Sequence, residues 1–107
     1  MTESEFNQQI DATLLQIEEA LDECEIDIDY ENSSGILTLT FDNGSQIIIN
    51  RQLPTRQLWL AARSGGYHFD FEAELQQWLC DSGAEPLRLL LNRCASEQAG
   101  EAVELSW

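Results

Sequence analysis

The sequence predicts an α+β fold, a two-layer α/β sandwich in which both helices cover one face of a six-stranded antiparallel sheet. Two observations lead to this prediction. Apolar residues recur with helical spacing only near the two ends of the chain, and the stretch between consists of short runs separated by turns. Consecutive strands joined by short turns pair as an antiparallel meander, and flanking helices can both cover one of its faces. The other face is then open to solvent.

The length and the composition fit one domain. Compact domains typically span about 100 to 200 residues, so we expect a single domain over residues 1–107. Hydrophobic residues make up 43% of the chain and include three Trp and four Phe. This is enough apolar surface to build a core, and we therefore expect the whole chain to fold.

A first helix is expected from residue 3 to residue 23. Thr2 followed by Glu5 fits a capping box, in which each side chain bonds the backbone N–H of the other residue. An apolar stripe with spacings of three and four then runs along the helix, formed by Phe6, Ile10, Leu14, Ile17 and Leu21. After it the period changes, which places the end of the helix near residue 23.

The first expected strand covers residues 25–31. Ile26, Ile28 and Tyr30 alternate strictly with Asp or Glu, as in a strand that rests one face on a core. Every outward side chain of this strand is then anionic. A turn is expected at residues 33–35, where two serines precede a glycine.

A hairpin is expected around Asn43-Gly44. This pair lies between two β-branched and apolar runs, 36–41 and 46–50, and Asn-Gly in that setting is the strongest short-range hairpin signal. Three more strands are expected between turns, at residues 56–62, 67–71 and 76–80. Together with the first strand and the two strands of the hairpin, they make the six strands of the sheet.

A second helix is expected after the loop at residues 81–83. Glu85 and Pro86 suit a first helical turn, and Gly100 supplies the stop. The apolar stripe of this helix is Leu87, Leu90, Leu91 and Cys94. The tail at residues 102–107 contains apolar side chains that we expect to pack on the helices.

Several kinds of chemistry are excluded. The three cysteines form no C-x-x-C pair, which favours reduced and mostly buried thiols. A single histidine, His68, rules out metal sites with two histidines, and no phosphate-binding or nucleophile motif occurs. The spacing leaves a Cys80 and His68 nucleophile pair open, but it favours His68 as a solvent-facing strand residue. We expect no enzymatic activity.

The net charge excludes two classes of partner. Twenty Asp and Glu against five Arg give a formal charge of −15, which repels nucleic-acid phosphates and anionic lipid headgroups. No apolar run approaches the roughly 18 to 20 residues that span a bilayer, and the acidic N-terminus does not resemble a secretory signal. The expected location is the cytoplasm. A cation, a basic protein surface or solubility alone remains to explain the charge.

The carboxylates are unevenly placed, with eleven of the twenty within residues 1–31 and no Lys or Arg among them. Glu18 with Asp22 and Glu19 with Glu23 are like-charge i,i+4 pairs, each costing about 0.2–0.5 kcal/mol. They also oppose the negative end of the helix dipole. A face that only keeps the protein soluble does not need this placement, so we favour binding of a cation or a basic partner. Oxygen ligands select hard cations, and an open site would hold them weakly.

An exposed tryptophan is expected in the strand at 56–62. Alternation sends Leu58 and Leu60 to one face and Trp59 to the other, so that the two leucines take the core and the indole stays on the open face. The alternative is a core tryptophan with both leucines exposed, which is the costlier arrangement. An exposed indole beside Asn50, Gln52 and His68 is typical of a binding hot spot.

The strings NRQLPTRQLWLA at residues 50–61 and SGGYHFD at 64–70 resemble the signature of the frataxin family in its bacterial, CyaY-type branch. Shorter matches at other positions extend the resemblance over essentially the whole chain: 4–6, 17–22, 43–45 and 98–101. The resemblance implies a frataxin-like α/β sandwich, weak binding of Fe²⁺ and Fe³⁺ on an acidic ridge, and contact with a cysteine desulfurase and the iron–sulfur scaffold protein. Other divalent cations are further candidates for the ridge.

The resemblance also implies which residues act. The carboxylates that it assigns to metal are Glu3, Glu18, Glu19, Asp22, Glu23, Glu25, Asp27, Asp29 and Glu31. The partner-binding residues matched to the family are Asn50, Gln52, Gln57 and Trp59, the tryptophan of the family, and His68 is added because it lies beside the exposed indole. Asn7 stands where bacterial relatives often have a histidine, and the link between helix and strand is about two residues shorter than theirs.

Two function classes remain open at this point. The chain is either an iron-binding regulator or iron chaperone of cluster assembly, or an acidic protein-binding modulator of the desulfurase for which metal is secondary. A ferroxidase is a distant third, because no set of Glu and His on facing helices forms a di-iron site. We expect a monomer, with oligomers only in the presence of iron.

Overall fold

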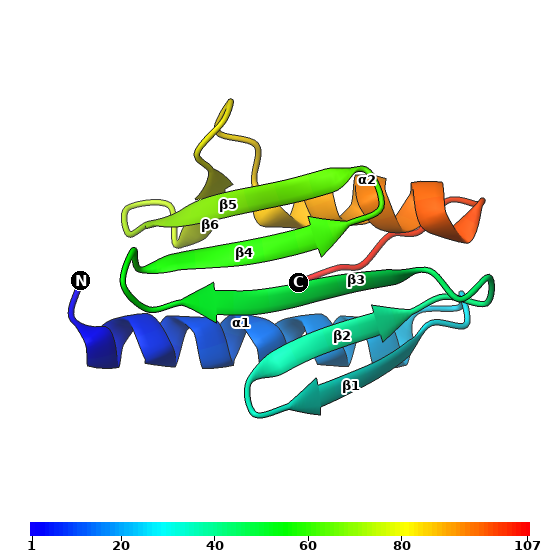
Figure 1. Ribbon diagram of the computed structural model, residues 1–107, viewed down its shortest axis with the longest axis horizontal. Helices are drawn as coiled ribbons and strands as arrows, with labels where there is room; N and C mark the ends of the chain where they lie inside the picture. The colour runs from blue at the N-terminus through cyan, green and yellow to red at the C-terminus, as the bar shows by residue number, and fades with distance from the viewer.

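The computed structural model, which describes residues 1–107, confirms the predicted fold of two helices and a six-stranded antiparallel sheet (Figure 1). The elements are α1 (Glu3–Glu23), β1 (Asp29–Ser33), β2 (Ile36–Thr40), β3 (Gln46–Gln52), β4 (Gln57–Ala62), β5 (Gly65–Glu72), β6 (Gln77–Cys80) and α2 (Leu87–Ala99). The strands lie in sequence order from β1 to β6. In Figure 1 both helices lie behind the sheet, and its front face is uncovered.

The predicted start of α1 is confirmed in detail. The Thr2 hydroxyl accepts from the Glu5 backbone N–H at 3.1 Å, and the Thr2 N–H donates to the Glu5 carboxylate at 3.0 Å. All members of the predicted apolar stripe are buried, from Phe6 to Leu21. The last turn of α1 holds no basic residue, so nothing within the helix offsets its acidic end.

The first strand begins later than predicted, at Asp29 instead of residue 25. Asp29 pairs with Thr40, the last residue of β2, so the residues before Asp29 have no opposite partner to bond. Ile28 is nevertheless buried, with 8% of its surface exposed. The alternation at residues 25–31 therefore reflects burial against the core, and only its second half reflects strand pairing.

The hairpin at Asn43-Gly44 is confirmed. The Asn43 side chain accepts from the Ser45 N–H at 2.9 Å, and Gly44 has a φ of 84°, in the left-handed region that favours glycine. At the turn between β1 and β2, Ser34 and Gly35 both have positive φ, as a two-residue turn of type I′ requires.

The core lies between the sheet and the helices, where 24 buried hydrophobic residues form one cluster. The indole N–H of Trp78 donates to the Thr13 hydroxyl at 2.9 Å, so this polar atom stays satisfied inside the core. Cys80 and Cys94 are buried and Cys24 is half-buried, and none of the three forms a disulfide.

The second helix begins at Leu87, one residue after Pro86, which serves as its N-cap, and Gly100 ends it with a φ of 74°. The tail packs along α2 as predicted. Val103 and Leu105 are buried, and the Asn92 side chain bonds both the N–H and the C=O of Leu105, at 2.8 and 3.1 Å. Neither helix is long and apolar enough to cross a membrane.

Candidate functional site

Eight of the nine carboxylates that the family resemblance assigns to metal follow one another along the chain, and we call these eight the acidic ridge. They lie on the last two turns of α1, on the link to β1 and on β1 itself: Glu18, Glu19, Asp22, Glu23, Glu25, Asp27, Asp29 and Glu31. All are exposed except Glu18, which is half-buried. Glu3 is not among them, because it lies in the first turn of α1, about 22 Å from Glu18 at 1.5 Å per residue.

Two side chains of β1 join the strand to α1. The Tyr30 hydroxyl donates to the Asp22 carboxylate at 2.7 Å, and the Asn32 amide donates to the Glu18 carboxylate at 3.1 Å. Asp22 and Glu18 are one helical turn apart, and Tyr30 and Asn32 are on the same face of the strand. The end of α1 and the edge strand are therefore held together through two ridge carboxylates.

The remaining carboxylates of β1 point to the opposite face of the sheet. Tyr30 lies opposite Leu39, which is in the core, whereas Asp29 and Glu31 lie opposite Thr40 and Thr38. The ridge thus wraps around the edge of the sheet, with helix carboxylates on one side of β1 and strand carboxylates on the other. No three His, Cys, Asp or Glu side chains come close enough together to hold a metal ion.

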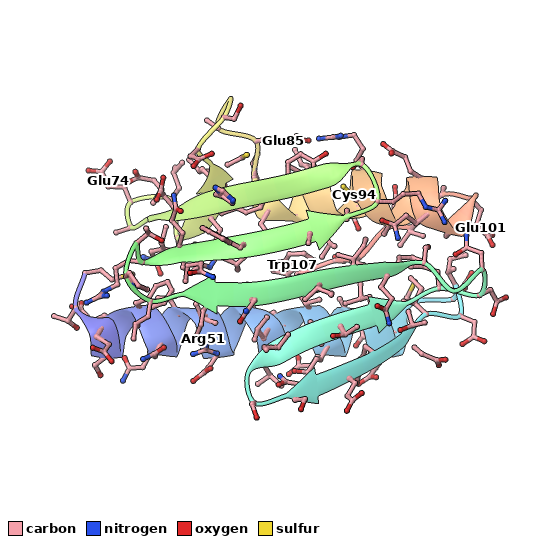
Figure 2. All side chains as sticks on the ribbon, in the orientation of Figure 1. Arg51, Glu74, Glu85, Cys94, Glu101 and Trp107 are labelled. Carbon is pink, nitrogen blue, oxygen red and sulfur yellow. The ribbon has the colours of Figure 1, made fainter.

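A counter-charge that sequence reasoning missed reaches α1 from β3. The Arg51 guanidinium donates to the Asp11 carboxylate at 2.6 Å and to the Asn7 amide oxygen at 2.9 Å, and Figure 2 shows Arg51 beside α1. Asn7 therefore has a structural partner and lies outside the acidic ridge. Asp11 is the one carboxylate within residues 1–31 that forms an ion pair.

We expect the uncompensated ridge to make the protein less stable at low ionic strength. The two like-charge pairs on α1 cost together up to about 1 kcal/mol, and salt screens such exposed charges. Adding NaCl at pH 7 should raise the melting temperature by a few degrees, up to about 4–8 °C if the full amount is recovered. MgCl₂ at matched ionic strength should raise it further, because a bound cation adds to screening. A melting temperature that ignores both salts contradicts the expectation.

The hydrogen bond to Asp22 raises the pKa of Tyr30 from its usual 10.0 to about 12, and the charges of Asp22 and Glu18 act in the same direction. A folded-state pKa above the unfolded one contributes stability that is complete below pH 10 and is lost as the pH rises toward 12. We therefore expect the melting temperature to fall more steeply between pH 10 and 12 in the wild type than in Tyr30→Phe. Tyr67→Phe, whose hydroxyl meets Ser64 instead, is the control. Equal slopes for all three proteins would argue against the Asp22 bond.

The residues predicted to bind partners come together on the open face of the sheet. Asn50, Trp59 and His68 lie opposite one another on β3, β4 and β5. The rings of Trp59 and His68 stack, with centroids 4.1 Å apart and planes 16° from parallel. Leu58 and Leu60 are buried, so the Trp59 indole is on the open face, as the alternation predicted. It is half-buried there instead of exposed, because one side of the ring stacks on His68.

Gln57 orders the indole from the same strand. Its side-chain oxygen accepts from the Trp59 indole N–H at 3.0 Å, and its amide donates to Asp70 at 3.2 Å and to Asp81 at 3.4 Å. The nearest His68 nitrogen lies 3.9 Å from Asp81. Cys80 is buried on the core side, so it does not form a pair with His68.

Trp59 is part of a shallow hollow of about 230 Å³ on the open face. We call four residues that line this hollow, together with Gln57, the aromatic patch: Asn50, Gln52, Gln57, Trp59 and His68. Ile48 adds an apolar wall, and 37% of its surface is exposed. Sequence reasoning missed Ile48, although three successive isoleucines at 47–49 in one strand place the middle one on the solvent face.

Comparisons with known proteins show which family this chain is similar to and agree with its fold. A family model described as a Frataxin-like domain matches residues 1–101. The iron-sulfur cluster assembly protein CyaY of Pseudomonas fluorescens is 51% identical over 104 residues, which cover 97% of this chain and 94% of that protein. The protein of the same name from Pseudomonas aeruginosa is 50% identical over 104 residues, covering 97% and 96%. A solved frataxin from Psychromonas ingrahamii superposes over the full length of both chains with a TM-score of 0.91 and 34% identity.

Proposed function

This chain belongs to the frataxin-like family, and we propose that it serves iron–sulfur cluster assembly by binding iron weakly and docking on the cysteine desulfurase and its scaffold protein. The observation that supports this proposal best is the acidic ridge, where eight carboxylates have no ion-pair partner and four of them lie at the unfavourable end of α1. The relatives that are about 50% identical carry the name of iron-sulfur cluster assembly proteins.

Iron would be a cargo of the ridge. Carboxylate oxygens suit Fe³⁺ and other hard cations, and water would complete the coordination of an ion on so open a surface. Because no three ligating side chains converge, a bound ion gains few protein ligands at once. Weak binding and easy release follow from this arrangement. The role that we propose is not enzymatic, and its setting is the cytoplasm.

The two surfaces suit two different contacts. The ridge offers a dense negative charge, which attracts a basic surface and speeds association with it. The aromatic patch offers a preformed stacked indole and imidazole, surrounded by amides that can bond a partner's backbone. We assign the ridge to the desulfurase and the aromatic patch to the scaffold.

In a second candidate function, the chain also docks on the desulfurase, but iron binding has only a secondary role. Two ridge carboxylates already accept hydrogen bonds from Tyr30 and Asn32, and the ridge holds no preformed metal site. The chain would then act as an acidic modulator of the desulfurase.

A desulfurase pull-down under strict chelation separates the two functions. Retention on the desulfurase without metal favours the modulator, and retention only with added Fe²⁺ favours the iron-dependent role. Cluster-assembly kinetics with purified desulfurase and scaffold, with and without this protein, test the proposal as a whole. An assembly rate that does not change at any concentration of the protein would overturn it.

A further inference from the structure

The two edges of the sheet differ in whether another segment of the chain covers them. On the β6 side, Leu79 forms a bridge with Pro86, and the Cys80 N–H donates to the Glu85 carbonyl at 2.9 Å, so the chain itself covers that edge. On the other side, β1 pairs only with β2. Figure 1 shows no segment beyond β1. Half of the backbone N–H and C=O groups of this strand therefore lack a strand partner, which is a template for pairing with another chain.

The free edge is held in shape by the rest of the molecule. The bonds from Tyr30 to Asp22 and from Asn32 to Glu18 attach β1 to α1 at two points along the strand. The tight turn at Ser34-Gly35 fixes the pairing of β1 with β2. An incoming segment would meet a row of backbone groups that is already extended, so little ordering of β1 is needed when it binds.

The charge around this edge selects the occupant. Asp29 and Glu31 stand on the open face of β1, and Asp22 and Glu18 stand on its helix face. An added strand lies about 4.8 Å from its neighbour and sends alternate side chains to both faces. Lys or Arg at successive positions of that strand would therefore meet carboxylates on both faces. A second copy of β1 would bring the same anions and be repelled.

We propose that the outer edge of β1 is a strand-addition site for an extended, basic segment of a partner protein. This inference rests on the proposed docking of the acidic ridge on a basic partner and states how that docking is made. Main-chain hydrogen bonds to β1 supply affinity, and the carboxylates on both faces supply the selectivity for a basic sequence. The carboxylates also keep the bare edge from pairing with other copies of this chain.

The test uses a synthetic peptide of Lys and Thr, with Lys at both odd and even positions, and the intact protein. The control is the same peptide N-methylated at consecutive central residues, which keeps its charge and removes backbone donors on both of its edges. We expect the unmethylated peptide to bind at least tenfold more tightly. NMR should show cross-strand contacts from the peptide to β1 and slower amide exchange in that strand.

A charge-reversed protein completes the test. Asp29→Lys with Glu31→Lys should lose most of the affinity for the unmethylated peptide, whereas Glu74→Lys with Glu97→Lys, which makes the same change away from β1, should keep it. Figure 2 shows Glu74 at the opposite end of the molecule from β1.

Equal binding of the methylated and unmethylated peptides would overturn strand addition and leave docking by charge alone intact. Peptide contacts that map to α1 instead of β1 would overturn it as well. If neither peptide binds and the desulfurase is not retained either, the proposed docking itself fails.

Discussion

Replacing three ridge carboxylates of α1 by amides, in Glu18→Gln, Glu19→Gln and Asp22→Asn, is expected to weaken Fe²⁺ binding by about tenfold, or about 1.4 kcal/mol. The change removes three charges from the part of the ridge where helix and strand meet. Amide oxygens still accept hydrogen bonds, so the contacts from Tyr30 and Asn32 survive. The loss therefore reports on charge, with the α1–β1 contact left in place.

The same variant should be as stable as the wild type or more stable. It removes both like-charge pairs on the helix, each costing about 0.2–0.5 kcal/mol, and it lowers the charge at the negative end of the dipole. Iron binding and stability are thus expected to change in opposite directions. A purely structural role for these carboxylates would instead lower both.

Anaerobic calorimetry with Fe²⁺ and thermal melts measure the two effects. A matched control makes the same number of substitutions at exposed positions outside the ridge: Glu74→Gln, Glu97→Gln and Glu104→Gln. The control should bind iron like the wild type. If paramagnetic broadening of the NMR spectrum centres on α2 instead of the ridge, the assignment of iron to these residues is wrong.

The order of elements could be predicted because each signal is local. The capping box at Thr2 and Glu5, the hairpin at Asn43-Gly44 and the stop at Gly100 involve residues within a few positions of one another, and the structure has all three. The start of β1 could not be read in the same way. Pairing depends on where β2 ends, at Thr40, and alternation at residues 25–28 records burial without a partner strand.

The same distinction between local and long-range features applies to the candidate site. Alternation placed Trp59 on the open face, and it also separates Tyr30 from Asp29 and Glu31 on β1. The contact of Arg51 with Asp11 joins residues 40 positions apart, and no local pattern in the sequence predicts it. The hydrogen bonds from Tyr30 and Asn32 to α1 likewise depend on how the strand lies against the helix. Sequence therefore indicates which carboxylates crowd together, and only the fold shows which are already engaged.

Trp59→Ala is expected to weaken binding to the scaffold and desulfurase assembly at least tenfold, because truncating a hot-spot aromatic costs on the order of 2 kcal/mol or more. The indole stacks on His68 and is fixed by Gln57, so it is presented to a partner without further ordering. Removing it also removes the apolar surface next to Ile48 in the hollow.

The same substitution should leave the protein folded, because the core keeps Leu58 and Leu60 and loses no buried side chain. The lost stack with His68 costs about 0.5–1.5 kcal/mol, which lowers the melting temperature by several degrees without unfolding the protein. Trp59→Phe is the matched variant: it retains a ring over His68 and should recover much of the binding. Affinity for the assembly, measured beside thermal melts of both variants, checks the prediction. An unfolded Trp59→Ala protein would show that the indole supports the fold. A folded variant that binds the assembly like the wild type would show that the indole is not a partner contact.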